Sequence, residues 1–230
     1  MFEKILRLGS DNFASFAIQT IDVLAQLDLT ILAIDEYEVT VVIGRIEGQI
    51  PKPYDSKKTQ SEQVRIALKR GLQSTFPEFE AQSWCISKPN RGRACVSGPL
   101  GLDVSLSHSR CWGASAFTTR GAIGIDVETL SRRLKEDTWA LFLSAFEIDW
   151  MRDVSQENIT IKALALWCAK EAYLKASQQA GKVSMSDIVF SSELEILSVR
   201  GVMLRDQWLT QVWQVDADFL LALCWSPQRS

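Results

Sequence analysis

Apolar residues recur at intervals of three and four in several stretches of this chain, as they do on the buried face of a helix. The spacing predicts helices over residues 61–72, 139–150 and 159–179, and Gly181 is well placed to end the last of them. A less regular pattern near the start of the chain predicts a further helix. Its apolar members are Phe13, Phe16, Ala17, Ile21 and Leu24.

Other stretches are short and rich in β-branched and aromatic residues, which is typical of strands. They cover residues 39–43, 84–86, 104–107, 112–118, 122–128, 212–215 and 219–225. Thr119-Arg120-Gly121 separates two of them and predicts a hairpin between 112–118 and 122–128. Strand-helix-strand character before and after about residue 119 suggests two similar α+β halves.

The composition is that of an ordinary globular protein, with 47% hydrophobic and 23% charged residues. A net charge of −3 gives no sign of nucleic-acid binding, because proteins that hold DNA are usually basic. An anionic ligand must therefore meet a local cluster of positive charge. No apolar run reaches the length of a membrane span, about 18 residues, so we expect a soluble, cytoplasmic protein.

The five cysteines are an odd number, lie far apart and include no Cys-x-x-Cys pair. This spacing indicates neither a disulfide framework nor a zinc site, and it is typical of a protein in a reducing cytosol. We expect most of the five in the hydrophobic core, where unpaired cysteine is common.

Three carboxylates and a lysine are the strongest candidates for chemistry. Asp126 and Glu128 lie two apart in a predicted strand and so share one face, and Glu171 and Lys175 lie four apart in a predicted helix. The carboxylates could converge and hold a hard divalent cation, which prefers oxygen ligands. Alternatively, the first two form one solvated face of an edge strand, and the other two are a surface ion pair.

Two of these stretches together resemble a known signature. Gly124-Ile-Asp-Val-Glu128 is followed, about forty residues later, by Trp167-Cys-Ala-Lys-Glu-Ala-Tyr-Leu-Lys175. This order and spacing resembles that of the 4′-phosphopantetheinyl transferases. Upstream, Ser107-His-Ser109 and Gly92-Arg93-Ala94, which stands where the family has Gly-Lys-Pro, resemble the larger, Sfp-type branch. The resemblance covers residues 84–182 approximately.

The resemblance implies an enzyme that transfers 4′-phosphopantetheine from coenzyme A to a serine of an acyl or peptidyl carrier protein and releases 3′,5′-ADP. It implies Mg²⁺, with Mn²⁺ as a substitute, held by Asp126, Glu128 and Glu171. The catalytic residues would be Asp126, Glu171 and Lys175, with Glu171 a candidate base for the serine proton and Lys175 facing a phosphate. We expect Asp126 to be an exposed carboxylate in a cleft.

Coenzyme A would be bound by Arg93, Ser107, His108 and Lys175. His108 is the only histidine, which excludes a multi-histidine metal site. A lone histidine is more often structural than catalytic, but its place beside an anion site favours a phosphate contact. Arg93 keeps the charge of the family's lysine and presents it as a planar fork.

The resemblance also implies a monomer of two α+β halves related by a pseudo-twofold, residues 1–119 and 120–230, with the ligand cleft between them and the metal site in the second. Its partners would be coenzyme A and the carrier protein, with no nucleic acid and no membrane. Two rival hypotheses are a noncatalytic coenzyme A or nucleotide-binding protein of the same fold and a Mg²⁺-dependent phosphohydrolase. The second lacks a further acidic cluster to position water.

Overall fold

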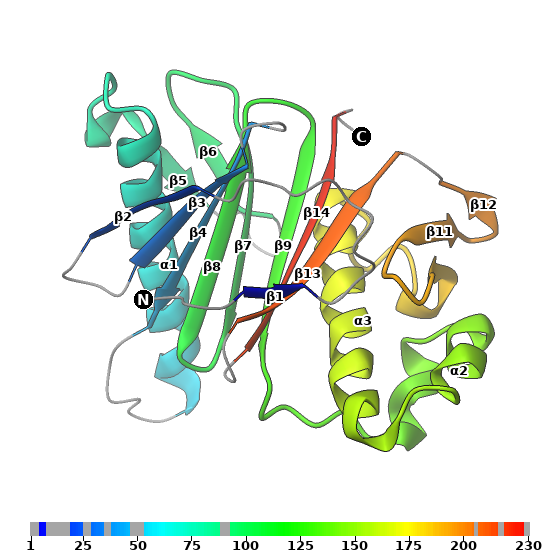
Figure 1. Cartoon of the computed structure of the whole chain (residues 1–230). Helices are drawn as coiled ribbons and strands as arrows, with labels where there is room; N and C mark the ends of the chain where they lie inside the picture. Colours follow the sequence, from blue (N-terminus) through cyan, green and yellow to red (C-terminus); the bar gives the residue numbers. More distant parts are fainter. Residues whose placement is uncertain are drawn as a thin grey trace.

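The structure of the chain is a computed structural model (Figure 1). It describes residues 5–7, 19–24, 29–34, 38–46, 53–87, 93–204, 207–215 and 219–227. Antiparallel sheets and helices share these residues, which confirms the α+β class. The pseudo-twofold relation and the boundary at residue 119 stay predictions.

Two antiparallel sheets form the centre of the fold (Figure 1). The first has the strand order β2 (Gln19–Leu24), β3 (Leu29–Ile34), β4 (Val39–Arg45), β8 (Trp112–Thr118) and β7 (Asp103–Ser109). The second has the order β1 (Ile5–Arg7), β13 (Leu209–Val215), β14 (Phe219–Ser226) and β9 (Ala122–Thr129). Strands β7 and β9 each end the order of their own sheet, and they contact each other.

One long helix packs on each sheet. Helix α1 (Pro53–Thr75) contacts β4, β8 and β7, and α3 (Gln156–Ala176) contacts β9, β14 and β13. The other elements are short: η2 (Ala81–Ser83), β5 (Cys85–Ser87), β6 (Cys95–Ser97), η3 (Glu136–Leu141), α2 (Ala145–Met151), η4 (Met185–Asp187), β10 (Ile188–Phe190), β11 (Ile196–Val199) and β12 (Val202–Met203). Within the described residues, no helix combines the length and apolar character that a membrane crossing requires.

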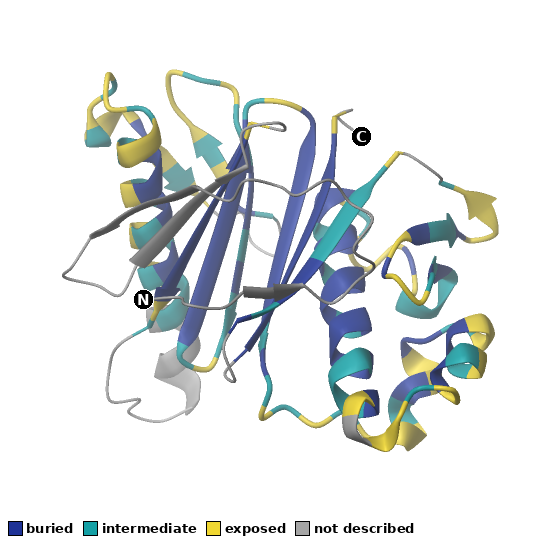
Figure 2. Ribbon diagram, viewed as in Figure 1, coloured by how far each residue is buried: buried dark blue, intermediate teal, exposed yellow. Residues whose placement is uncertain are grey.

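Burial follows the alternation of side chains along each strand. In β4, Val41 and Ile43 pack in one core with residues of β9, β13 and β14, whereas Val42 packs in another core with Leu68 and Leu72 of α1. Strands β8, β9 and β14 are buried along nearly their whole length, as their dark blue ribbons in Figure 2 show. The centre of the molecule is therefore apolar, and a polar group that enters it needs a partner there.

Most of the predicted elements are confirmed. The helices predicted over 61–72 and 159–179 lie in α1 and α3, and every predicted strand overlaps an observed one. Helix α3 ends at Ala176, three residues earlier than predicted. Gln178 (φ 55°) is the first residue after it with a left-handed backbone, ahead of Gly181.

The single helix predicted over 139–150 is wrong. The chain forms η3, breaks, and begins α2 after Ser144. Ser144 and Glu147 make a capping box, in which each side chain bonds the other residue's backbone N–H. This motif starts a new helix, because it satisfies N–H groups that have no partner within the first turn.

The hairpin predicted around Thr119-Arg120-Gly121 is also wrong. Strand β8 pairs with β4 and β7, whereas β9 pairs with β14 over its full length, so the chain crosses here from one sheet to the other. Gly121 has φ 79°, and a Cβ there would lie 1.8 Å from the carbonyl oxygen of Ser226. The glycine thus serves the close approach of this turn to the end of β14.

The helix predicted near the start of the chain is wrong where the structure describes it. Ile21 and Leu24 lie in β2, which suits the β-branched residues of this segment. The other apolar members, Phe13, Phe16 and Ala17, lie outside the described residues.

The expectation that most cysteines are buried is wrong as well. Cys168 and Cys224 are buried, Cys111 is half-buried, and Cys85 and Cys95 are exposed. The two exposed residues lie on the strands β5 and β6, which pair only with each other among the described strands.

Candidate active site

A cavity of about 520 Å³ lies between α1, α3 and strand β7. All four residues predicted to bind coenzyme A line it, and they come from three parts of the chain. Arg93 precedes β6, Ser107 and His108 belong to β7, and Lys175 belongs to α3. The fold therefore brings the four predicted coenzyme A ligands together, although the first and last of them lie more than 80 residues apart in the sequence.

Side chains, in place of a backbone ladder, bond strand β7 to strand β9. The carboxylate of Asp103 and the hydroxyls of Ser105 and Ser107 accept backbone N–H groups from every second residue of β9, at 2.7, 3.1 and 3.3 Å. The three donors are Ile123, Ile125 and Val127. Buried N–H groups need such partners. These side-chain bonds form a seam between β7 and β9. The alternation of polar residues from 103 to 109 is its signal in the sequence, where it predicts a strand over 104–107 and, by resemblance, a coenzyme A contact at Ser107 and His108.

Helix α3 lies so close to β9 that position 124 has room only for hydrogen. A Cβ at Gly124 would lie 1.9 Å from the carbonyl oxygen of Ala172, a contact that no side chain tolerates. The glycine of the Gly-Ile-Asp-Val-Glu stretch thus sets the distance between the strand that carries Asp126 and the helix that carries Lys175.

Asp126 lies where the seam between β7 and β9 meets helix α3. Its Oδ1 accepts hydrogen bonds from Ser107 Oγ (2.7 Å) and Lys175 Nζ (2.7 Å). Its Oδ2 is buried and has no hydrogen-bond partner among the described residues. Only 5% of the residue is exposed, so the expectation of an exposed carboxylate is wrong, because α3 covers this side of β9. A buried oxygen without a partner is suited to a cation or a donor.

Glu128 is held at both of its oxygens. Ser109 Oγ donates to Oε2 (2.8 Å), and the guanidinium of Arg132 donates to Oε1. Burial raises the pKa of Glu128, the bond from Ser109 lowers it, Asp126 raises it further, and Arg132 opposes the rise. Arg132 is not among the residues predicted from the sequence, where its only signal is its place four residues after Glu128.

Glu171 faces the same region from α3 and has no hydrogen bond or ion pair with any described residue. Burial raises its pKa, and Lys175 lowers it. The charges of Asp126 and Glu128 raise it further, and Arg132 opposes them. A glutamate with a raised pKa and no partner is well suited to accept a proton.

The two lysines of the helical stretch point in different directions, as their spacing implies. Lys175 Nζ donates to Asp126 Oδ1 and to the carbonyl oxygen of Ile125 (3.0 Å), and it lines the cavity. Lys170 is fully buried and pairs with Glu147 at 2.6 Å. Lys170 therefore belongs to the core and not to the candidate site.

Arg93 lines the cavity, but most of its guanidinium is bonded within the protein. Its Nε donates to the carbonyl oxygen of Val104 (2.8 Å), and its Nη2 donates to Asp103 (2.8 Å) and to the carbonyl oxygen of Ile123. Arg93 thus ties β7 to β9 at the end of the seam. Its charge still lies in the lining of the cavity.

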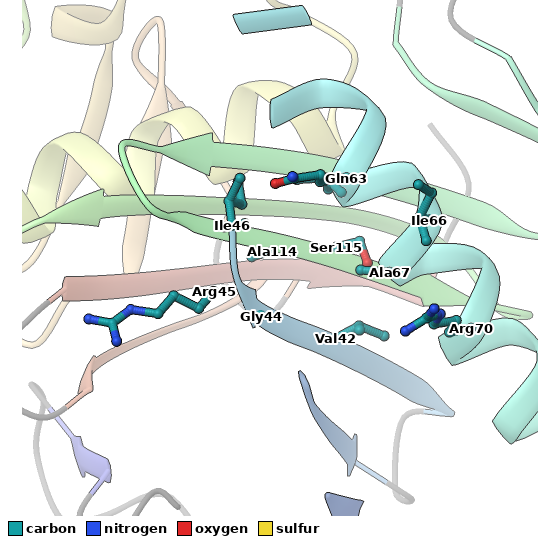
Figure 3. Close-up of a pocket in the computed structure, with 12 residues that line it drawn as sticks. Val42, Gly44, Arg45, Ile46, Gln63, Ile66, Ala67, Arg70, Ala114 and Ser115 are labelled. Carbon is teal, nitrogen blue, oxygen red and sulfur yellow. The ribbon is translucent and has the colours of Figure 1, made fainter. Parts of the chain in front are cut away.

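A second cavity, of about 260 Å³, lies between α1 and strands β4 and β8 (Figure 3). Its walls are mainly apolar, with Val42, Ile46 and Ile66 among them, and Arg70 and Ser115 supply polar groups. No residue in its described lining is acidic. The described lining of the larger cavity has no carboxylate of its own, but two of its residues, Ser107 and Lys175, bond Asp126 directly. Metal binding and proton transfer need carboxylates or similar groups, so we place the candidate chemistry at the larger cavity.

The carboxylates beside the larger cavity have the chemistry that a hard divalent cation requires. They offer only oxygen donors, and one oxygen of Asp126 and both oxygens of Glu171 are without hydrogen bonds to the described residues. Lys175 bonds one oxygen of Asp126, and Arg132 bonds one oxygen of Glu128. No group of three His, Cys, Asp or Glu side chains in the described part of the chain is already arranged as metal ligands.

Residues 122–224 match the family model of the 4′-phosphopantetheinyl transferase superfamily. The matched segment is less than half of the chain and includes Asp126, Glu128, Glu171 and Lys175. Strand β7 lies outside it, so the match does not distinguish the Sfp-type branch. A comparison with curated proteins finds no match to this chain.

Proposed function

We propose that this protein transfers 4′-phosphopantetheine from coenzyme A to a serine of an acyl or peptidyl carrier protein and releases 3′,5′-ADP. The observation that carries the proposal is the meeting of Asp126 and Lys175 beside the larger cavity, within the segment similar to the superfamily. Ser107 and His108 line the same cavity, which supports the Sfp-type branch.

In this reaction the serine Oγ bonds to the β-phosphorus of coenzyme A. The bond from that phosphorus to the bridging oxygen breaks, and 3′,5′-ADP leaves with the electron pair. Negative charge spreads over the phosphoryl oxygens, so positive groups and hydrogen-bond donors placed around them lower the barrier. Lys175 and His108 line the cavity from α3 and β7 and would bind these oxygens from two sides.

Glu171 would accept the proton that the serine loses. Its carboxylate has no bond to a described residue, and burial holds its pKa above the usual value. A base is more effective when its pKa approaches the working pH. Ser107 would keep Asp126 in place, since its hydroxyl donates to Oδ1 while accepting the N–H of Val127.

Asp126, Glu128 and Glu171 would hold Mg²⁺, or Mn²⁺ in its place, and the bound ion would neutralise charge on the pyrophosphate. We further propose a cytoplasmic monomer with two similar halves, residues 1–119 and 120–230. All five strands of the first sheet precede residue 119, and three of the four strands of the second sheet follow it, which supports this division.

The test is the intact mass of an apo carrier protein after incubation with coenzyme A, Mg²⁺ and this protein. We expect a gain of one phosphopantetheine that is lost with EDTA and reduced about 100-fold or more in rate by Asp126→Asn. This substitution keeps the shape of a buried side chain. Asp149→Asn makes the same change on an exposed residue of α2 and should leave the rate unchanged.

Two other results would contradict the proposal in different ways. Coenzyme A binding without any mass gain on carriers from several pathways would indicate a noncatalytic binding protein. Release of free phosphopantetheine in the absence of a carrier would indicate a hydrolase.

A further inference from the structure

Arg132 follows β9 in a segment without regular structure, and its guanidinium has two partners. It donates to Glu128 Oε1, and its central carbon lies 4.5 Å from the ring centroid of Trp167. About a third of the side chain is exposed (35%), compared with 12% for Glu128. The guanidinium thus rests on an aromatic face of α3 while it neutralises a carboxylate of β9.

Asp126 and Glu128 differ in what they leave open. Asp126 Oδ2 has no hydrogen-bond partner among the described residues, whereas Glu128 has Ser109 on Oε2 and Arg132 on Oε1. A metal ion can take the open oxygen of Asp126 without breaking a bond. At Glu128 it meets either a neutral hydroxyl or a positive guanidinium.

Two positive charges cannot share one carboxylate oxygen at contact distance without strong repulsion. The hydroxyl of Ser109 can remain, because a carboxylate oxygen has a second lone pair. An ion that takes Oε1, alone or together with Oε2, therefore has to displace the guanidinium, and the exposure of Arg132 gives it room to move. Its stacking on Trp167 does not depend on Glu128, so it has a place to stay.

We propose that Arg132 is an internal counter-cation that occupies Glu128 until a divalent metal ion displaces it. The proposal rests on the proposed function, in which Glu128 is a metal ligand. Arg132 then sets how tightly the metal binds before coenzyme A arrives, and keeps the acidic cluster neutralised without the metal. The influence of its charge on Glu171, the third carboxylate, is in keeping with this role.

The experiment is a titration of Mn²⁺ in the absence of coenzyme A and carrier, with free Mn²⁺ read by electron paramagnetic resonance. Arg132→Gln removes the competing charge and should tighten Mn²⁺ binding by about tenfold, the size expected for one partly exposed charged hydrogen bond. Arg133→Gln is the matched control. Arg133 is an exposed neighbour that bonds the carbonyl oxygen of Leu130, and its loss should change the affinity less than about twofold.

Three results would overturn the proposal. They are equal Mn²⁺ affinities for the two variants, weaker Mn²⁺ binding by Arg132→Gln than by the wild type, and no Mn²⁺ binding by either variant or the wild type. Arg132→Lys keeps the charge without the planar fork and should bind Mn²⁺ with an affinity between those of the wild type and Arg132→Gln. If lysine and glutamine tighten binding equally, the charge is irrelevant and the proposal is wrong. The lysine variant also compares directly with the wild type should Arg132→Gln fail to fold.

This readout is separate from catalysis. A tenfold difference in Mn²⁺ affinity together with no modified carrier would overturn the proposed function and leave the role of Arg132 in place. A modified carrier together with equal Mn²⁺ affinities would support the proposed function and overturn the role of Arg132.

Discussion

Helix α3 carries two lysine–carboxylate pairs of almost equal length but different environment. Lys170 Nζ lies 2.6 Å from Glu147, and Lys175 Nζ lies 2.7 Å from Asp126. Both side chains of the first pair are 0% exposed, whereas those of the second are 24% and 7% exposed. The five-residue spacing turns the lysines about 140° apart around the helix, so one faces the core and the other the cavity.

The Lys170 pair has its hydrogen bonds satisfied. The ammonium also donates to the carbonyl oxygens of Phe142 (2.8 Å) and Met185 (3.0 Å), which completes its three donors. Glu147 accepts further bonds from Ser144 and from the backbone N–H of Phe190 (2.9 Å). Burial lowers the pKa of Lys170 to about 8, and Glu147 opposes this effect. The pair joins α2, α3 and β10 and leaves nothing for a ligand.

The Lys175 pair remains incomplete. Two of the three donors of the ammonium reach described residues, Asp126 and Ile125, and the second oxygen of Asp126 has no partner there. Glu171, beside Lys170 in the sequence, has no bonded partner among the described residues. The comparison teaches that unused bonding capacity, and not charge or proximity, distinguishes a candidate site from a structural ion pair.

Lys170→Met should have the largest effect on stability. It leaves Glu147 buried without its cation, so we expect a loss of about 3–5 kcal/mol in the free energy of unfolding, measured by urea denaturation. Lys182→Met removes an exposed lysine and should change the value by less than about 0.5 kcal/mol. A loss below about 1 kcal/mol for Lys170→Met would remove the contrast between the two pairs.

Lys175→Met should affect activity strongly and stability only slightly. We expect transfer to the carrier to fall about 100-fold, because a positive group near the phosphoryl oxygens is lost. The free energy of unfolding should fall by about 1 kcal/mol, since Asp126 keeps its bond from Ser107. Lys175→Arg retains the charge and should preserve more activity. Unfolding of Lys175→Met as easily as of Lys170→Met would make Lys175 a structural residue.

Glu171→Gln should have the smallest effect on stability, and the size of this effect depends on pH. Burial raises the pKa of Glu171 in the folded protein, so its ionised form is less favourable there than in the unfolded chain. Its favourable contribution is complete below the unfolded pKa and is lost as pH rises through the folded pKa. Glutamine should therefore raise Tm at pH 7 by about 1–3 °C and leave it unchanged near pH 4.

Thermal unfolding at both pH values measures this difference. The control is Glu195→Gln, which makes the same change on an exposed residue. An equal Tm for Glu171→Gln and the wild type at pH 7 would show that Glu171 is not destabilised in the site.

Local patterns account for what could be predicted. The alternation of side chains along β9 places Asp126 and Glu128 on one face, and the helical periodicity of α3 turns Lys170 away from Glu171 and Lys175. Both follow from backbone geometry alone. The long helices and central strands were predicted for the same reason.

One failure occurred where partners distant in sequence decide, and another where a local capping motif overrides the apolar spacing. Strand β9 pairs with β14 and not with the neighbouring β8, and a capping box divides a segment whose apolar spacing predicts one helix. Periodicity carries no information about which strand edge a neighbour will occupy.

The sequence by itself thus determined which carboxylates and which lysine could act together, because their spacing along one strand and one helix fixes their direction. Only the tertiary structure decided that Asp126 is buried, that Arg93 and the serines of β7 bond to β9, and that Arg132 occupies Glu128. These features depend on the contact between two sheet edges and on the approach of α3 at Gly124. Burial and hydrogen bonding arise from such contacts between distant segments, which no local pattern records.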